Sequence, residues 1–100
     1  MREKESSFVW DPTKEFVNIQ KHGVDFPTAT QVFRDPKRKI IFDEKHSYQE
    51  ERFFCIGRVG EDVLTVRFSY QEGKIRIIGA GYWRKGARFY DQENKENIEE

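Results

Sequence analysis

The chain has 100 residues, the size of one small domain, and its 18 basic and 18 acidic residues give a net charge of zero. Hydrophobic residues make up 36% and aromatic residues 15%, which is enough to fill a core and excludes a disordered chain. No apolar run is long enough to span a membrane, and the first eight residues contain no secretory signal. Cys55 is the only cysteine, so internal disulfides and cysteine-based zinc sites are excluded. We therefore expect a cytoplasmic domain.

The net charge of zero conceals an asymmetry along the chain. Residues 91–100 hold five acids and one lysine, which leaves 17 basic and 13 acidic residues in 1–90. We expect residues 1–90 to form a single domain and residues 91–100 to form an acidic, frayed tail. A mildly cationic domain suits an anionic partner, although a solvated charged surface would have the same composition.

Two helices are predicted near the start of the chain. The first covers "DPTKEFVNIQKHG", in which Asp11 suits the N-cap, Pro12 the first turn and Gly23 the left-handed position after the last turn. The second is short and covers "VDFPTATQVFRDP", with Asp25 as its cap and Pro36 beyond its end.

After the second helix the apolar period changes to two, which is typical of strands. The predicted strands cover 8–10, 39–44, 50–59 and 63–70, followed by one from residue 75 onward. Residues 84–96 have helical propensity, interrupted by Gly86. The expected fold is α+β, with two N-terminal helices packed on an antiparallel β-sheet meander and a C-terminal helix.

The hairpin after residue 70 has a well-specified register if Glu72-Gly73 forms a two-residue loop. The expected cross-strand pairs are Tyr70 with Ile75, Phe68 with Ile77 and Val66 with Gly79. This register places apolar residues opposite one another on one side of the hairpin, and a slip by one residue would destroy the match.

The other side of the same hairpin carries Arg67 and Arg76 as diagonal neighbours, roughly 7–8 Å apart at the backbone. Two guanidiniums at that separation could clamp adjacent phosphates. Arg52 joins them only if the strand over 50–59 faces the same way. Surface ion pairs with Asp or Glu explain the same arginines equally well.

No motif for a metal, a nucleotide or another cofactor is present. His22 and His46 lack metal-site spacing, and Cys55 is expected to be a small buried hydrophobe. The remaining polar groups suit RNA cleavage without a metal or cofactor, which needs a base for the 2′-hydroxyl, an acid for the leaving oxygen and cations for the phosphate. Each group could equally be an ordinary solvated or paired side chain. The available residues are Lys21, His22, His46, Glu51, Arg52, Arg67, Arg76, Arg84, Lys85, Arg88 and Tyr90.

The segment "GAGYWRKG", residues 79–86, places two aromatics and two cations among three glycines. Glycine makes a backbone permissive, so we predict a mobile hinge that contacts the substrate and lets the terminal helix move as a lid. Tyr82 or Trp83 could stack on a base, while packing under the terminal helix is the alternative for Trp83.

The stretch "FVWDPTKEFVNIQKHGVDFPTATQVFRDP", residues 8–36, resembles the opening of BrnT toxins, the toxin half of the BrnT/BrnA type II toxin–antitoxin systems. The matching positions are Trp10-Asp11-Pro12, Lys14, Asn18, Lys21-His22-Gly23-Val24, Phe26, Ala29, Phe33 and Asp35-Pro36. Further on, His46, Glu51-Arg52-Phe53, Ile56-Gly57-Arg58 and Arg76-Ile77-Ile78 fall in the family's order. The resemblance extends from residue 8 to about residue 90.

This resemblance implies a small RelE-like ribonuclease that slows growth by cutting RNA. It also implies a partner, a BrnA-like antitoxin of the ribbon-helix-helix kind, which neutralises the toxin. The pair would repress its own operon, with the toxin reaching operator DNA only through the antitoxin.

The chain departs from the family after the last strand. Many members continue as Ser-Ala-Arg and carry a Glu in the next helix, whereas Gly79-Ala80-Gly81 and Ala87 stand in those places here and Tyr90 still matches. The alternative function is therefore an interaction module that has lost cutting and acts with the antitoxin at the operator.

The sequence and the resemblance together give the following assignments. We predict catalytic roles for Arg67, Arg76, Arg84, Tyr90 and His22. We predict RNA-binding roles for Lys21, Arg52, Tyr82, Trp83, Lys85 and Arg88. Because stabilising the charge on the phosphate is usually the largest contribution, arginine charge is expected to matter more than either histidine.

Overall fold

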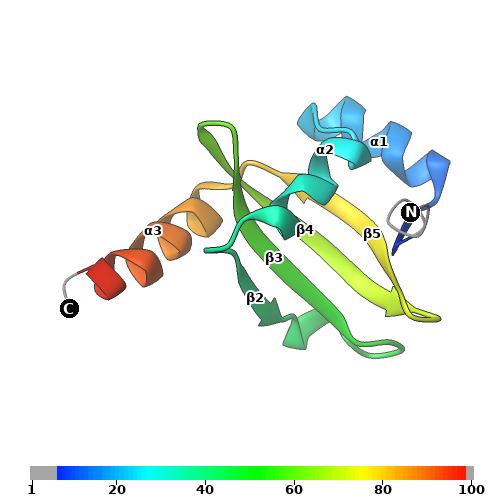
Figure 1. Ribbon diagram of the computed structural model, residues 1–100. Coiled ribbons are helices and arrows are strands. Elements are labelled where there is room, and N and C mark those ends of the chain that lie inside the picture. The colour runs from blue at the N-terminus through cyan, green and yellow to red at the C-terminus, as the bar shows by residue number, and fades with distance from the viewer. Residues whose placement is uncertain (1–6, 99–100) are drawn as a thin grey trace.

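A computed structural model describes residues 7–98 and shows a five-stranded sheet with helices on one face, along one edge and at one end (Figure 1). The strands are β1 (Phe8–Val9), β2 (Lys39–Phe42), β3 (Arg52–Val59), β4 (Asp62–Gln71) and β5 (Lys74–Gly81). The helices are α1 (Pro12–His22), α2 (Phe26–Thr30) and α3 (Arg84–Ile98), with 3-10 turns η2 (Gln31–Arg34) and η3 (Glu44–His46). The α+β class and the terminal helix are confirmed.

The predicted helix caps are present. The Asp11 side chain accepts a hydrogen bond from the backbone N–H of Thr13, and Gly23 ends α1 at φ 71°. Asp25 caps α2 by accepting from the N–H of Thr28. That hydrogen-bonded threonine lowers the pKa of Asp25.

The sheet is mixed, so the prediction of a purely antiparallel sheet is wrong. Strands β2 to β5 pair antiparallel in chain order, but β1 joins the free edge of β5 in parallel, giving the order β1-β5-β4-β3-β2. A two-residue strand leaves almost no pattern in a sequence, and its direction depends on where the chain returns after the helices.

The hairpin of β4 and β5 keeps the predicted register only up to Phe68. Tyr70 faces Ile75 and Phe68 faces Ile77, as expected. Beyond that point a β-bulge shifts the pairing, so that Val66 faces Ala80 instead of Gly79. Ile78 is the extra residue on β5.

The core lies between the sheet and the segment from Val24 to η2, on the front face in Figure 1. Its fully buried members include Val24, Phe26, Ala29, Val32, Cys55, Leu64, Val66, Phe68, Ile77 and Ala80. At Gly57 a Cβ would lie 2.9 Å from the carbonyl oxygen of Val32, so glycine lets η2 rest directly on β3. Desolvation raises the pKa of the Cys55 thiol to about 12, which fits a buried hydrophobe.

Helix α1 is fixed at the edge of the sheet through one polar residue. Asn18 is the buried residue of α1, while Phe16, Val17 and Ile19 are exposed. Its Nδ2 donates to the carbonyls of Val24 and Ala80, at 3.0 Å each, and its Oδ1 accepts from the N–H of Ala80 at 3.1 Å. Asn18 thus pairs with β5 as a neighbouring strand would.

Helix α3 projects from the end of the sheet (Figure 1) and continues through residues 91–98. The acidic segment that begins at residue 91 is therefore helical as far as Ile98. Gly86 does not interrupt this helix. It lies against β4, where a Cβ would be 2.1 Å from Thr65 Oγ1, so the close packing requires a glycine.

The glycines at 81 and 86 allow neighbouring side chains to lie directly against the backbone, which corrects the interpretation of residues 79–86 as a permissive hinge. Gly79 and Gly81 belong to β5 and Gly86 to α3, and positive φ among the described glycines occurs only at 23, 60 and 73. A Cβ on Gly81 would lie 2.6 Å from the ring of Trp83. The segment outside regular structure is only Tyr82-Trp83.

Replacing Asn18 with Leu should lower the free energy of unfolding by about 3 kcal/mol or more, since three buried backbone groups lose their partners at roughly 1–3 kcal/mol each. Chemical denaturation measures this. Gln20→Leu, the matched change on an exposed position of α1, should stay within about 0.5 kcal/mol of the parent. Equal stability of the two variants would show that Asn18 does not hold α1.

Replacing Gly86 with Ala should destabilise the protein by about 1–3 kcal/mol through overpacking against Thr65, despite the better helix propensity of alanine. The double variant Gly86→Ala/Thr65→Ala should recover most of that loss. It removes Oγ1 and leaves the Thr65 Cβ at an ordinary 3.5 Å. A double-mutant cycle measured by thermal unfolding tests the contact, and simple additivity would refute it.

Candidate active site on the open sheet face

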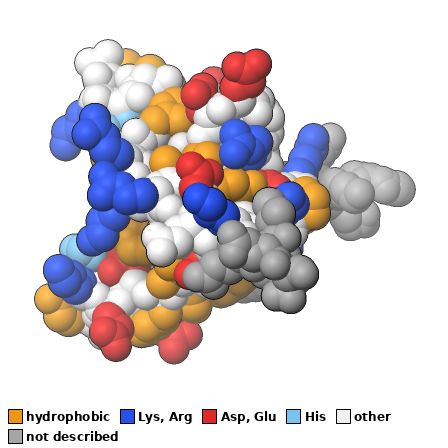
Figure 2. All heavy atoms as spheres, turned by 90° about the vertical axis from the view of Figure 1, so that its left-hand side faces the viewer, with side chains coloured by type: hydrophobic (Ala, Val, Ile, Leu, Met, Phe, Trp, Pro, Cys, Tyr) orange, Lys and Arg blue, Asp and Glu red, His pale blue; other side chains and the backbone are white. Residues whose placement is uncertain are grey.

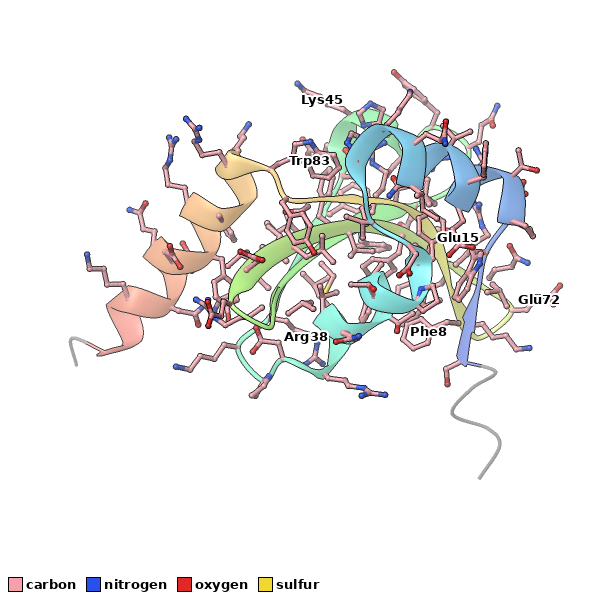
Figure 3. All side chains as sticks on the ribbon, turned by 90° about the horizontal axis from the view of Figure 1, so that it is seen from above. Phe8, Glu15, Arg38, Lys45, Glu72 and Trp83 are labelled. Atoms are coloured by element: carbon pink, nitrogen blue, oxygen red, sulfur yellow. The ribbon has the colours of Figure 1, made fainter. Side chains whose placement is uncertain are left out.

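The sheet face opposite α2 and η2 carries the predicted arginines. Cross-strand pairing gives three rows on it, namely Arg52–Ser69–Arg76, Phe54–Arg67–Gly79 and Ile56–Thr65–Gly81. Arg67 and Arg76 therefore share a face as expected, and Arg52 joins them. In Figure 3, Trp83 and Lys45 lie on this side of the sheet, while Phe8 and Arg38 lie on the other.

Two of these arginines are engaged by one carboxylate. Glu50 Oε2 accepts from Arg52 Nε at 3.1 Å and also accepts a short hydrogen bond from Arg76. The bond from Arg76, ahead of that from Arg52, holds the pKa of Glu50 below its usual value. Ion pairing with Asp or Glu, the alternative interpretation of Arg67 and Arg76 from sequence, describes Arg76, and Arg52 is paired with the same carboxylate.

Arg67 is held differently. Its guanidinium lies 5.4 Å from the centre of the Phe54 ring, and its Nε lies 3.6 Å from Asp43 Oδ2. Within residues 7–98, Nε is buried and has no hydrogen-bond partner. The side chain remains 35% exposed, so Arg67 is fixed in place but is still accessible to an anion.

Asp43 connects Arg67 to a histidine that was left out of the predicted site. Asp43 is buried, and its carboxylate oxygens lie 3.0 and 3.2 Å from His46 Nδ1. A carboxylate only accepts hydrogen bonds, so Nδ1 is the protonated nitrogen and Nε2 of the neutral ring is left as an acceptor. The spacing in "FDEKH" of three residues between Asp43 and His46 was the available signal in the sequence.

The Asp43–His46 pair is supported by the backbone around it. Ser47 Oγ donates to the carbonyl of Asp43 at 2.6 Å and accepts from the N–H of Arg52 at 2.9 Å. The N–H of Asp43 in turn donates to the carbonyl of Arg52 at 2.8 Å. The turn containing η3 is thereby fixed to β3, and the imidazole is about half exposed at its edge.

A cavity of about 370 Å³ opens beside Arg67 on the side of α1. It is lined by Thr13, Lys14, Val17, Asn18, Lys21, His22, Phe54, Arg67, Ile78, Gly79 and Trp83. The structure thus brings four predicted residues together, since Lys21, His22 and Trp83 surround Arg67. Lys14 completes this cationic wall, and it was not among the predicted site residues.

Trp83 forms the partition at the end of this cavity. Its ring lies 5.1 Å from the His22 ring in an edge arrangement and remains 42% exposed. A second cavity on the far side, towards α3, also includes Phe54, Arg67 and Trp83 in its lining. The two cavities form one groove with Arg67 between them, and Figure 2 shows Lys and Arg side chains gathered in a band along one side of the molecule.

Four other predicted residues line neither of these two cavities. Tyr82 and Arg84 line a third depression, which Val63 and Trp83 also line, and Arg88 is exposed on α3. Tyr90 is buried, and its hydroxyl donates to Asp35 Oδ2 at 2.5 Å. The structure does not bring these four into the groove.

Tyr90 attaches α3 to the far end of β3. Arg58, whose N–H also donates to Asp35 and whose side chain lies over the Tyr90 ring, is four residues from Phe54. That is about 13 Å along a strand from the row of Arg67. Burial, followed by the hydrogen bond to Asp35, raises the pKa of Tyr90. The geometry indicates a structural role for this residue.

The fold is that of a small α+β protein in which Arg67 lies on the open sheet face, with Lys14, Lys21 and His22 on α1 and His46 in η3. Within residues 7–98, no three His, Cys, Asp or Glu side chains are grouped as metal ligands. Nor does this part of the chain contain a helix with the length and hydropathy of a membrane span.

The family model described as "Ribonuclease toxin, BrnT, of type II toxin-antitoxin system" matches residues 10–86. The chain therefore belongs to the BrnT family of ribonuclease toxins, which confirms the resemblance seen in the sequence. Among curated proteins, none matches the chain. The match ends at Gly86, so most of α3, with Arg88 and Tyr90, lies beyond it.

Replacing Tyr90 with Phe should lower the free energy of unfolding at neutral pH by about 1.5–3 kcal/mol, the usual range for a hydrogen bond to a charged group. Burial opposes ionisation of Asp35, but the hydrogen bonds from Tyr90 and two backbone N–H groups hold its pKa below the ordinary 3.8. The contribution of the Tyr90–Asp35 hydrogen bond to stability is complete above pH 3.8, the pKa of Asp35 in the unfolded chain. It is lost as the pH falls through the lower pKa of the folded protein.

Urea titrations of both proteins from neutral to strongly acid pH measure this difference, which should shrink at the acid end. RNA cleavage by the Tyr90→Phe variant should persist wherever the variant is folded. Loss of cleavage with unchanged stability would instead return Tyr90 to the catalytic residues predicted from sequence.

Proposed function

We propose that this BrnT family member is a metal-independent endoribonuclease that acts at Arg67. The observation that carries the proposal is the fixed but accessible guanidinium of Arg67, which meets Asp43 of the Asp43–His46 pair and lines one cavity with His22, Lys21 and Trp83. A cation held in position before the substrate arrives stabilises the charge that builds on a phosphate without having to reorganise.

We infer a reaction in which these side chains have the following roles. Nε2 of His46 takes the proton of the ribose 2′-hydroxyl, since Asp43 occupies Nδ1. The 2′-oxygen attacks the adjacent phosphorus, and the bond to the 5′-oxygen of the next nucleotide breaks. His22 protonates that leaving oxygen, and Arg67 stabilises the non-bridging oxygens. The products are a 2′,3′-cyclic phosphate and a 5′-hydroxyl.

The lysines and the tryptophan bind the strand. Lys21 and His22 occupy the last turn of α1, where positive charge suits the helix dipole. Together with Lys14 they can neutralise the phosphates that flank the one being cut, while the half-exposed Trp83 ring offers a stacking surface.

The partners follow from the family. A type II toxin acts opposite an antitoxin, and we propose a BrnA-like ribbon-helix-helix protein that neutralises this chain in the cytoplasm. Operator DNA would be bound only through that antitoxin. We likewise propose a RelE-like relationship for the fold.

A second candidate is an interaction module that has lost cutting activity and acts with the antitoxin at the operator. The ion pairs of Arg52 and Arg76 with Glu50 and of Arg67 with Asp43 favour it, because each arginine on the open face already has an acidic partner. Growth of cells that express the chain without its antitoxin separates the two candidates, since only the ribonuclease should arrest growth.

Replacing Arg67 with Gln should reduce cleavage of a defined RNA by about 10²–10³-fold, the usual loss for a group that stabilises developing charge. His46→Ala should cost about 10²–10⁴-fold, so this mechanism replaces the expectation from sequence that arginine charge matters more than either histidine. Arg76→Gln should cost less than either, since Glu50 already neutralises Arg76. Initial rates with EDTA present, and identification of the cyclic phosphate end, complete the measurement.

Lys45→Gln is the matched control, because it removes an exposed charge beside His46 and leaves the Asp43 pair intact. Its rate should remain close to the parent rate. Unimpaired cleavage by Arg67→Gln, or complete loss of cleavage in EDTA, would refute the proposed mechanism.

A further inference from the structure

The cavity on the α3 side of Arg67 has a different character from the cationic wall on the α1 side. It has a volume of about 400 Å³, within the usual range of small-molecule sites. Its lining is mostly apolar and consists of Ile41, Phe54, Ile56, Thr65, Arg67, Trp83, Lys85, Gly86 and Phe89. The open sheet face therefore has an apolar hollow directly beside its accessible arginine.

The position of this hollow beside Arg67 suits a base of an RNA strand. Phe54, Arg67 and Trp83 line both cavities, so a strand whose phosphate lies on Arg67 has its next base within reach of the apolar side. Single-stranded RNA presents unstacked bases, which proteins bind between aromatic and apolar side chains. Trp83 and Phe89 are both partly exposed at this hollow.

We propose that this cavity is a subsite for the nucleobase next to the scissile phosphate and that it favours guanine or uracil. The inference rests on the proposed ribonuclease function. The cationic side chains of its lining, Lys85 and Arg67, carry only hydrogen-bond donors. The Thr65 hydroxyl is buried beneath Gly86, so it adds no accessible acceptor in this arrangement.

A donor-only edge discriminates between bases by their carbonyl groups. Guanine presents O6 and N7 and uracil presents a carbonyl oxygen, all of which accept hydrogen bonds. Adenine and cytosine present amino donors at the corresponding edge, which would face a cation. Lys85 is exposed at the start of α3 and can reach the edge of a base without being desolvated itself.

The test measures binding separately from cleavage. The probe is a single-stranded RNA pentamer with one variable base, whose nucleotide carries a 2′-deoxy ribose so that the strand cannot be cut at that point. Fluorescence anisotropy should show about tenfold tighter binding of the guanine and uracil probes than of the adenine and cytosine probes, in line with a hydrogen bond to a charged group.

Two variants test the cavity itself. Ile41→Trp fills it and should weaken binding of the guanine and uracil probes by about tenfold, as expected when one stacked base is lost. Ile40→Trp is the matched control, because Ile40 is exposed on the opposite face of the same strand, and it should bind as the parent does. Lys85→Met should abolish the difference in affinity between the guanine and adenine probes, in addition to any loss of affinity that both probes share.

Equal binding by the Ile41→Trp and Ile40→Trp variants, or no base dependence in the parent, would overturn the subsite. Base-dependent binding by a protein that cuts no RNA would refute the ribonuclease mechanism and leave the subsite standing. If the parent cuts RNA without any base preference and Lys85→Met cuts in the same way, the subsite is refuted and the ribonuclease mechanism stands.

Discussion

The side-chain amide of Asn18 is the interaction on which the arrangement of the active-site groove depends. β1 covers the edge of β5 only at Ile75 and Arg76, and beyond the bulge Asn18 takes over that edge at Ala80. The same amide holds the carbonyl of Val24, where the chain leaves α1. Because the polar atoms of the Asn18 amide are all paired, α1 is fixed at the sheet edge even though its apolar residues are exposed. The last turn of α1 thereby lines the same cavity as Arg67.

The arginines on the open face differ in their acidic partners. Arg52 and Arg76 share Glu50, so two positive charges meet one negative charge in a partly exposed ion pair. Arg67 meets Asp43, but Asp43 is also held by His46, and the Nε of Arg67 remains without a hydrogen bond in the described part of the chain. Similar side chains on one face thus have different surroundings, and Arg67 is distinguished by a partly exposed side chain whose buried Nε has no hydrogen bond.

The fold was largely predictable where local physics decides it. The caps at Asp11, Gly23 and Asp25 and the turn after Gln71 follow from backbone preferences of a few adjacent residues. The site was less predictable. Three residues expected to bind or cut RNA line the cavity beside Arg67, namely Lys21, His22 and Trp83. Tyr90 instead donates a hydrogen bond to Asp35, which is 55 residues away in sequence. The Asp43–His46 pair was visible as a spacing, but nothing local showed that the carboxylate would be buried beside Arg67.

By itself the sequence determined the secondary structure, the family and the shared face of Arg67 and Arg76, because capping, alternation and hairpin register depend on short-range geometry. Only the tertiary structure decided which charges neutralise one another, that a parallel β1 makes the sheet mixed, and that the glycines at 81 and 86 admit a Trp83 ring and a Thr65 side chain. These outcomes depend on which groups meet across long separations in the chain. A carboxylate offsets the charge of an arginine only at a distance of a few ångströms, and a side chain requires a glycine beside it only at contact distance. The packing of the whole domain sets both distances.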